Sequence, residues 1–210
     1  MKKILLSIIF LFQILTSYSQ VILKSSIGVI CYDTINFIPT WTKYTLRPEM
    51  LAKNYGREDL AFKTDMRLSK KCRVKSSEYT GSGYDRGHLI PAGDFTWSEE
   101  ELKKTFIMTN VAPQVPRLNR GPWRILEEYI RFEVINRDSA IIYTGTLGNM
   151  DDVGRIVVPE YFWKVAQWYS GGKIIKEEAW LYENSEKRQT RATTETSPKN
   201  FLRIVYGNKR

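Results

Sequence analysis

The sequence predicts a mixed α+β fold, built on a mainly antiparallel sheet with packed helices. Two short β-rich segments, residues 27–32 and 40–46, flank a turn region, and polar and apolar residues alternate along the second. A glycine pair at 171–172 separates two further β-rich runs and predicts a hairpin. Between these groups, residues 118–135 carry apolar side chains at helical spacing. Together these patterns favour an α+β domain.

The individual strands are expected where β-branched and aromatic residues cluster. Segments 27–32 and 40–46 are predicted to form an antiparallel pair. Further strands are predicted at residues 139–144, 157–158, 161–169 and 174–182. Residues 106–111 are expected to be extended and central. The polar segment 184–197 is expected to be an exposed loop.

Capping residues predict where the helices begin. Ser98 and Glu101 have capping-box spacing, so a helix should run through Lys104. The clearest helix has one apolar face at spacings of three and four residues, made of Trp123, Leu126, Ile130 and Val134.

Two further helices and one long loop are predicted from local signals. A short helix should open at Pro48, and the Ser-Pro pair at 197–198 should begin a last helix that ends at Tyr206. The long polar stretch 54–82 is expected to be a loop anchored by Phe62 and Met66.

The first nineteen residues have the features of a signal peptide. Lys2 and Lys3 precede a run of about twelve mostly apolar residues, and small residues follow at 17–19. We expect cleavage near Ser19–Gln20, which would make the protein secreted or periplasmic. The alternative is a retained anchor, although the run is short for a membrane span. One domain is then expected over residues 20–210, with no stable membrane association.

The charge balance favours an anionic partner. The chain carries 32 Lys and Arg against 23 Asp and Glu, a formal net charge of +9. Such a surplus favours polyanions, nucleic acid above all, although charge alone does not decide it.

The chain has two cysteines, Cys31 and Cys72. In an exported chain they could form one disulfide, and two separate thiols are the alternative. With only one histidine, they cannot make a structural zinc site without carboxylates.

That histidine, His88, lies in the stretch Asp85-Arg86-Gly87-His88. Phosphodiester hydrolysis needs a base that deprotonates water, a donor that stabilises charge on the phosphorus group, and neutralisation of the leaving oxygen. An imidazole suits the first task near neutral pH, and a guanidinium suits the second.

A second polar group lies about thirty residues on, where Asn119 precedes the clearest helix. Its amide oxygen suits a hard cation such as Mg²⁺, which keeps several waters. In a regular helix, Glu127 would lie roughly 12 Å along the axis and about 80° round it from Asn119. Glu127 would then act through a metal-bound water, unless the backbone breaks at Gly121.

Four motifs in order resemble the DNA/RNA non-specific endonuclease family, the ββα-metal (His-Me finger) nucleases of the endonuclease G type. They are Asp-Arg-Gly-His, the following Leu-Ile-Pro-Ala-Gly-Asp, the segment Thr-Asn-Val-Ala-Pro-Gln at 109–114, and Leu-Asn-x-Gly-x-Trp-x-x-Leu-Glu at 118–127. The similarity is dense from about residue 79 to residue 131.

The resemblance implies a ββα-metal site and cleavage of DNA and RNA with one Mg²⁺ ion, or Mn²⁺, per site. It makes His88 the general base, Asn119 the direct metal ligand and Glu127 a carboxylate that holds a metal-bound water. Arg86 would contact the phosphate, while Asp85 and Asn110 would support the site.

The chain departs from the family pattern at one position. A second phosphate-binding arginine is expected just before an aromatic-x-x-Asp motif, which Phe62 and Asp65 match. The nearest upstream arginine, Arg57, lies a few residues too far away, so Arg57 or Arg67 could take its place. The two other function classes are a secreted nucleic-acid-binding protein without cleavage activity and a membrane-anchored basic protein. The sequence leaves a homodimer open.

Overall fold

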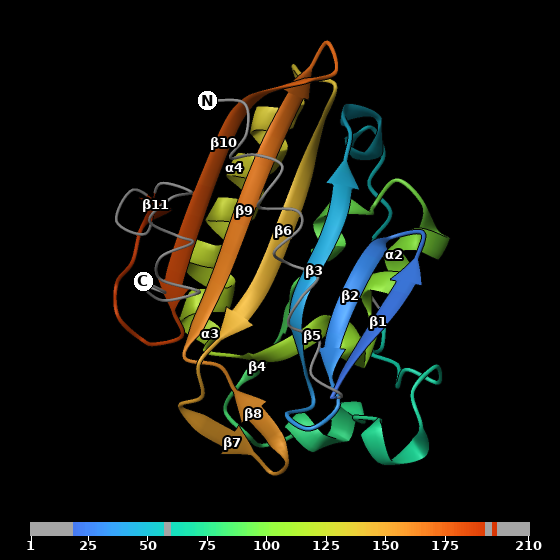
Figure 1. Ribbon diagram of the computed structural model, residues 1–210, viewed down its shortest axis with the longest axis vertical. Helices are drawn as coiled ribbons and strands as arrows, with labels where there is room; N and C mark the ends of the chain where they lie inside the picture. The colour runs from blue at the N-terminus through green and yellow to red at the C-terminus, as the bar shows by residue number, and fades with distance from the viewer. Residues whose placement is uncertain (1–18, 57–59, 192–194, 197–210) are drawn as a thin grey trace.

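The computed structural model describes residues 19–56, 60–191 and 195–196, and its main element is a large antiparallel sheet. Seven strands pair in the order β1-β2-β3-β6-β9-β10-β11 (Figure 1). Their bounds are Gln20–Ser25, Gly28–Asp33, Ile38–Leu46, Ser139–Leu147, Tyr161–Ser170, Lys173–Glu183 and Glu195–Thr196. All neighbouring strands run antiparallel. The predicted fold class is confirmed.

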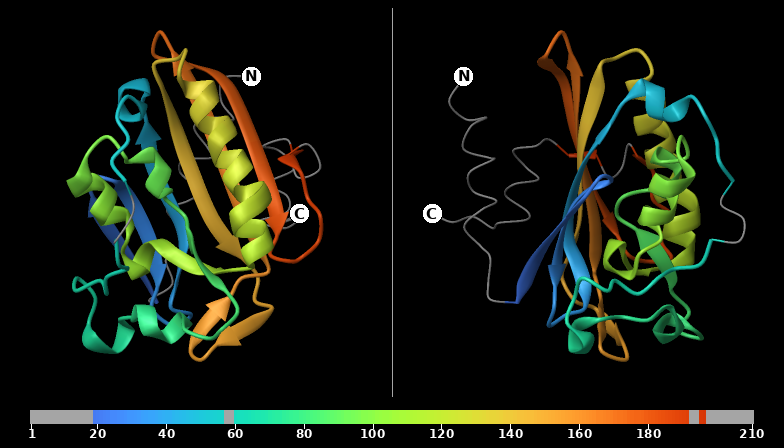
Figure 2. Two further views of the ribbon diagram at one scale, coloured as in Figure 1. Left: turned by 180° about the vertical axis from the view of Figure 1, so that it is seen from behind. Right: turned by 90° about the vertical axis from the view of Figure 1, so that its right-hand side faces the viewer.

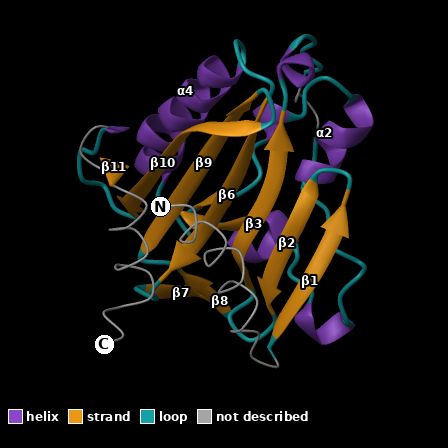
Figure 3. Cartoon of the chain, turned by 45° about the horizontal axis from the view of Figure 1, so that its top comes forward, coloured by secondary structure: helices purple, strands orange, loops and turns teal. Residues whose placement is uncertain are grey.

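Helices cover one face of this sheet (Figures 2 and 3). The longest is α4 (Arg124–Val134), which lies over β6, β9 and β10. Its inner side is completely buried through Leu126, Ile130 and Val134, as the apolar spacing predicts. No helix in the described part of the chain combines the length and apolar character needed to cross a bilayer.

A small two-stranded sheet carries the histidine stretch. Strand β4 (Asp85–His88) pairs antiparallel with β5 (Val111–Gln114), and each residue of β4 has one partner on β5. The chain then passes through the helical turn α3 (Pro116–Leu118) and the π-helical turn η6 (Asn119–Trp123) into α4. Residues of the sequence motifs therefore lie on two paired strands and on the helical segment that follows them.

The described chain also contains a second hairpin and several short turns. The hairpin pairs β7 (Asp151–Val153) with β8 (Ile156–Val158). Short 3-10 turns are η1 (Pro48–Leu51), η2 (Lys70–Cys72), η3 (Ser76–Tyr79), η4 (Ala92–Asp94) and η5 (Met108–Asn110). In the long segment before β4, Phe62 packs against the core as predicted, whereas Met66 is 69% exposed. The predicted anchor at Met66 is therefore wrong.

The helix α2 (Glu99–Thr105) begins as predicted, because the Ser98 hydroxyl accepts a hydrogen bond from the Glu101 amide. Residues 106–111 are not a strand. Met108–Asn110 form the turn η5, and β5 begins only at Val111. The last helix predicted from 197 to 206 lies outside the described residues.

The sequence prediction missed β1, whose only fully buried side chain is Leu23. With a single buried position, the strand shows no alternation that could distinguish it from a loop. Backbone pairing with β2 defines it instead.

The two cysteines do not pair, so of the two alternatives that the sequence left open, the structure has separate thiols. The Cys31 thiol donates to Gln20 Oε1 at 3.4 Å, and Cys72 Sγ accepts from the Ser69 hydroxyl at 3.2 Å. Successive side chains of a strand point to opposite faces. Tyr32, the neighbour of Cys31 on β2, shares the main core with Cys72. Cys31 therefore points away from the side where Cys72 lies.

We expect two reactive thiols per chain when the protein is unfolded without reductant, because neither sulfur has a disulfide partner. Thiol titration in denaturant measures this directly, and the variants Cys31→Ser and Cys72→Ser should each lower the count by one. A count near zero in the unreduced parent protein would contradict the structure.

Candidate active site

An open pocket brings the sequence motifs together. Its volume is about 410 Å³, and its lining comes from the segment before β4, from β4, from the end of α2 and from η6. The residues that line it are Phe62, Tyr84, Asp85, Arg86, His88, Phe106 and Asn119. Asp85, Arg86, His88 and Asn119 were all predicted as site residues. Glu127, Asn110 and Arg67 do not line the pocket.

The pairing of β4 with β5 aims two of these side chains. Arg86 and His88 are two residues apart on an extended strand, so they share a face. Gly87 between them faces the other way, where a Cβ atom would lie 2.3 Å from Gln114 Oε1. Glycine therefore permits the close pairing of β4 with β5 that sets the direction of its two neighbours.

Two aromatic rings that contact each other pack against the His88 imidazole. Its centroid is 5.1 Å from the ring of Phe62 and 5.1 Å from that of Phe106, the second in an edge-on arrangement at 77°. Such contacts restrict the ring without engaging its polar atoms. The histidine is half-buried at the wall of the pocket.

The Arg86 guanidinium is tethered at one end. Its Nη2 atom donates to the Ser76 carbonyl at 2.6 Å. Its Cζ atom lies 5.4 Å from the centroid of the Tyr79 ring and 5.7 Å from that of the Phe62 ring. These contacts orient the planar group, while the side chain still lines the pocket. A guanidinium held in this way can present its remaining donors to an anion.

The Asp85 carboxylate connects β4 to η6. It accepts from Asn119 Nδ2 at 2.9 Å and from Arg120 Nε and Nη2 at 2.8 and 2.6 Å. Partial burial would raise the pKa of Asp85. The hydrogen bonds from Arg120 and Asn119 and the charges of Arg120 and Arg86 outweigh burial, so the pKa is lowered.

This bond also sets the orientation of the Asn119 amide. An ionised carboxylate can only accept hydrogen bonds, so the amide NH₂ must face Asp85. The amide oxygen is then the free ligand atom of Asn119, in a side chain that lines the pocket. The direct-ligand role predicted for Asn119 fits this orientation.

The segment 118–135 is not one regular helix. Gly121 leaves the helical region, with φ −111° and ψ −107°, and regular α-helix begins at Arg124. The expectation that Asn119 and Glu127 lie on one continuous regular helix is therefore wrong. The backbone break that the sequence left open is present, and it allows Asn119 to turn toward Asp85.

Glu127 lies on α4 and does not line the pocket. It is half-buried on the side of α4 that carries Trp123 and Arg131, four residues before and after it. Its charge acts on Lys164 of β9 and on Arg131. Burial lowers the pKa of Lys164, and the charges of Glu127 and Asp94 oppose that shift.

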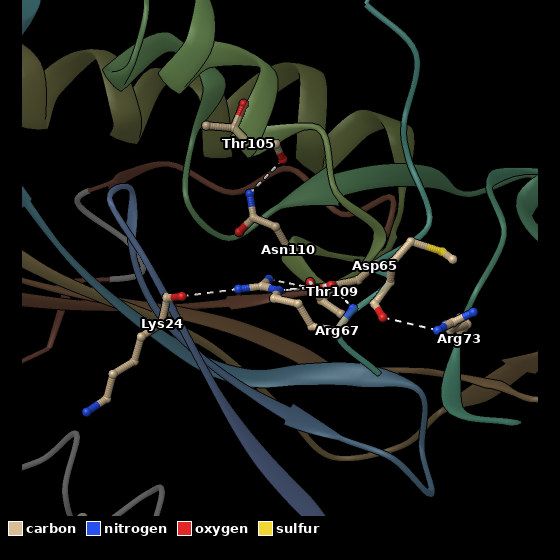
Figure 4. A network of polar contacts seen from close by, with 8 residues as sticks. Lys24, Asp65, Arg67, Arg73, Thr105, Thr109 and Asn110 are labelled. Carbon is tan, nitrogen blue, oxygen red and sulfur yellow. Dashed lines mark hydrogen bonds and ion pairs between the residues drawn. The ribbon is translucent and has the colours of Figure 1, made fainter. Parts of the chain in front are cut away.

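Asn110 is completely buried and supports the strand end next to His88. Figure 4 shows its amide directed at Thr105. Its Nδ2 donates to the carbonyls of Ile90 and Thr105 at 2.9 and 3.0 Å, and its Oδ1 accepts from the Ile90 amide at 2.9 Å. One amide thus joins the segment after β4 to the end of α2, as expected of a supporting residue.

Of the two arginines suggested for a second phosphate contact, Arg67 does not line the pocket. Arg67 binds Asp65 through Nε at 2.9 Å and Nη2 at 2.6 Å, and its Nη1 donates to the Lys24 carbonyl (Figure 4). The geometry gives Arg67 a structural role instead. Arg57 lies outside the described residues.

Comparison with known proteins places the chain in a family. A model of the DNA/RNA non-specific endonuclease family matches residues 7–201. This chain is a member of that family. Mitochondrial endonuclease G of Homo sapiens is 32% identical over 171 residues, which are 75% of this chain and 58% of the relative. A nuclease of Nostoc sp. is 36% identical over 137 residues, which are 64% of this chain and 49% of the relative.

A solved structure supports the same placement. The crystal structure of an EndoG/EndoGI complex matches with a TM-score of 0.80 at 27% identity, covering 88% of this chain and 83% of that one. The present chain spans about half to three fifths of the length of the human and Nostoc relatives.

The donors in the pocket fit the divalent ion of a non-specific endonuclease. In the part of the chain that the structure describes, no three His, Cys, Asp or Glu side chains gather as a metal-binding cluster. The oriented Asn119 oxygen is a hard donor at an open pocket, which suits an ion that keeps most of its waters.

Two residues near the site were not predicted from the sequence. Arg120 forms a two-bonded ion pair with Asp85, and Lys164 is buried under the site helix. Arg120 gave no signal beyond its positive charge. Lys164 gave one, because it interrupts the alternating apolar residues of β9 at a position where a core side chain is expected.

The Asp65 carboxylate predicts a measurable acid sensitivity. Burial would raise its pKa, but hydrogen bonds from Arg67 and Thr109 outweigh burial and lower it. A lowered folded-state pKa stabilises the protein above the unfolded value of about 3.9, and this contribution disappears as the pH falls through the folded value.

We therefore expect Asp65→Asn to cost roughly 2 kcal/mol at pH 7, because it breaks bonds to a buried charge. Between pH 5 and pH 3 the variant should lose less stability than the parent protein. Urea unfolding across this range measures both effects. Asp152→Asn, on the exposed β7–β8 hairpin, is the control and should follow the parent curve. Equal acid sensitivity of Asp65→Asn and the parent would contradict the assignment.

Proposed function

We propose that this protein is a metal-dependent nuclease that hydrolyses phosphodiester bonds in DNA and RNA without sequence specificity. The observation that carries the proposal is one pocket in a family member, lined by His88, Arg86 and the oriented amide of Asn119. Each of these groups suits one of the three tasks of the hydrolysis.

His88 is the general base in this mechanism. Its imidazole accepts a proton from the attacking water, which requires a neutral nitrogen near pH 7. Phe62 and Phe106 keep the ring at the pocket wall, so the base meets the water in one orientation. His88 is the natural candidate for the base because it is the one histidine in the sequence.

Arg86 binds the scissile phosphate. Because its guanidinium is fixed by Ser76 and Tyr79, it can stabilise charge on the phosphate oxygens with little reorganisation. Arg120, already at the pocket edge through Asp85, adds positive charge for the substrate backbone.

One Mg²⁺ or Mn²⁺ ion per site is the cofactor that we propose. When bound, such an ion stabilises negative charge on the leaving oxygen. Asn119 would hold it directly, Asp85 would keep the amide turned, and Glu127 would act through a water molecule. The absence of a carboxylate from the direct ligands would leave the ion available to substrate phosphate.

We also propose that the protein is exported after cleavage near Ser19–Gln20. The charged start, the apolar run and the small residues at 17–19 support this. The human relative is named as mitochondrial. A mitochondrial address would instead be expected to use an amphipathic, arginine-rich leader, which residues 1–19 do not resemble.

His88→Ala is expected to lower plasmid and RNA cleavage by at least about 100-fold with Mg²⁺, since general base catalysis contributes about 10²–10⁴-fold. The same variant should still bind DNA in a filter or mobility assay. His88→Phe keeps aromatic contact with Phe62 and Phe106 and should be equally inactive, which separates lost chemistry from lost packing.

EDTA should abolish cleavage by the parent protein, and added Mg²⁺ or Mn²⁺ should restore it. Retained cleavage in His88→Ala would reject the proposed base. DNA binding without cleavage in the parent protein, with either metal, would favour the rival function of a nucleic-acid-binding protein.

Processing is tested by expressing the full chain in a bacterial host and measuring the mass of the exported product. The expected N-terminus is Gln20 or a residue next to it, because the small residues precede that bond. A control in which Ile9 and Leu11 are replaced by Lys should block export. Recovery of exported protein that still begins at Met1 would reject cleavage.

A further inference from the structure

The turn of the β7–β8 hairpin reaches a segment that precedes the site strand. Gly154 and Arg155 are the two residues between the hairpin strands, and Gly154 has a positive φ of 63°. Tight hairpin turns need such a backbone conformation, which glycine adopts freely. The hairpin lies beside residues 71–79 at the lower end of the molecule (Figures 1 and 2). Its turn therefore brings Arg155 to Glu78, which is 77 positions away in the chain.

All three nitrogen atoms of the Arg155 guanidinium donate hydrogen bonds to this segment. Nε donates to Glu78 Oε2 at 3.0 Å, and Nη1 donates to the Lys71 carbonyl at 2.8 Å. Nη2 donates to the Arg73 carbonyl and, at 3.3 Å, to Glu78 Oε1. The Cζ atom lies 4.3 Å from the centroid of the Phe37 ring, which packs against the core. One side chain thus fastens three positions of the segment to the hairpin.

The Glu78 carboxylate carries this connection into the turn η3. Its Oε1 atom also accepts from the Lys75 amide at 2.7 Å, at the start of the turn. Partial burial would raise the pKa of Glu78, but hydrogen bonds from Arg155 and from the Lys75 amide outweigh burial and lower it. Glu78 is therefore ionised at neutral pH, and hydrogen bonds to an ionised acceptor are stronger than neutral ones.

The same turn supports the arginine of the pocket. Ser76, its first residue, accepts a hydrogen bond from Arg86 Nη2, and Tyr79, its last, places its ring against the guanidinium. Residues 71–79 are all described and belong to no strand, so no sheet pairing fixes these two contacts. Burial of the Tyr79 ring anchors the end of the segment, while Arg155 holds its carbonyls and its carboxylate.

We propose that Arg155 is a positioning residue, which holds the turn η3 so that Arg86 meets the phosphate in one orientation. The proposal rests on the proposed function, in which Arg86 binds the scissile phosphate. Without Arg155, two carbonyls and the Glu78 carboxylate lose their donor, so η3 and the Ser76 carbonyl move more freely. Arg86 can still meet a phosphate, but less often in the geometry that stabilises the transition state. The rate of chemistry should then fall more than the affinity for substrate.

The first test follows hydrogen exchange by NMR in the metal-free protein with EDTA present, which needs no catalysis. The Glu78 and Thr80 amides donate to the Lys75 and Ser77 carbonyls in η3. Arg155→Met should speed the exchange of these two amides about tenfold or more, because a segment with fewer tertiary contacts opens more often. Exchange in β9 should stay unchanged. Equal exchange of the η3 amides in the parent protein and the variant would overturn the proposal.

The second test separates rate from binding on a short oligonucleotide with Mg²⁺. Arg155→Met should lower kcat about tenfold and leave KM within about threefold, because a small misplacement of a catalytic group can cost up to about 100-fold in rate. In the Arg86→Ala background the same change should lower kcat by less than about twofold, since the group to be positioned is gone. An equal fall of kcat in both backgrounds would show that Arg155 does not act through Arg86.

Arg155→Lys separates geometry from charge. It keeps the positive charge but lacks the planar fork that bonds a carboxylate and two carbonyls at once, so it should still lower kcat by about threefold or more. Full activity of this variant would show that charge near the pocket is enough, and would overturn the positioning role. If Arg155→Met does not fold, Arg155→Lys takes its place in the exchange measurement and in the comparison of backgrounds.

Arg137→Met is the matched control. Arg137 also bonds a carboxylate and a carbonyl, both of Glu133, and its Cζ atom lies 5.9 Å from the centroid of the Trp168 ring. It follows α4 at the end away from η6. The control removes the same charge but should keep kcat within about twofold, because salt screens a charge over the length of α4. A fall in kcat equal to that of Arg155→Met would assign the effect to lost charge or general loosening and reject the proposal.

The tests distinguish failure of this proposal from failure of the proposed function. If the parent protein fails to cleave nucleic acid, the proposed function is rejected, while exchange in the metal-free protein still reports whether Arg155 holds η3. If the parent protein cleaves and the effects of Arg155→Met and Arg86→Ala are independent, the function stands and the positioning role is rejected.

Discussion

The contact on which the site depends is the bond between the Asp85 carboxylate and the Asn119 amide. Asp85 belongs to a four-residue strand and Asn119 to a kinked helical turn 34 positions later. Because the carboxylate can only accept, one bond both joins the two segments and decides which atom of the amide faces the pocket. Arg120 strengthens the arrangement by holding the other side of the same carboxylate.

Strand β4 is short, and among the described residues it pairs with β5 alone, so side chains must supply part of its rigidity. The Ser76 carbonyl and the Tyr79 ring hold Arg86 in place on one side. Beyond the strand, the buried Asn110 amide makes three hydrogen bonds and fixes Ile90, two residues after His88. The base and the phosphate-binding group therefore lie on a support that is fixed at both ends.

The same helix that presents Asn119 to the pocket covers a set of buried charges. Asp94, Arg131, Glu127 and Lys164 lie between α4, η4 and the sheet, where apolar packing alone would be expected to give higher stability. Replacing such a group by apolar residues is often neutral or stabilising in other proteins. Hydrogen bonds hold this polar group together, because Arg131 Nη1 donates to Asp94 Oδ1 and the Tyr44 hydroxyl donates to Asp94 Oδ2.

The sequence by itself determined the sheet-rich fold class, the start of α2 and four of the residues that meet in the pocket. These features depend on local patterns: alternation along β3 and β9, the Ser98 cap, and motifs in which Asp85, Arg86 and His88 are neighbours in the chain. Patterns of this kind act over a few residues, so they survive in a single sequence.

Only the tertiary structure decided the kink at Gly121, the pairing of β1, the separation of the cysteines and the roles of Arg67 and Lys164. Each depends on which distant side chain comes near. Asp65 forms an ion pair with Arg67. Tyr32 shares the core with Cys72, so the adjacent Cys31 points away from Cys72. Lys164 finds its contacts on other elements, with the Thr144 hydroxyl on β6 and the Trp123 ring of η6. Local propensity contains no information on such long-range partners, because they are set by how the layers of the fold pack together.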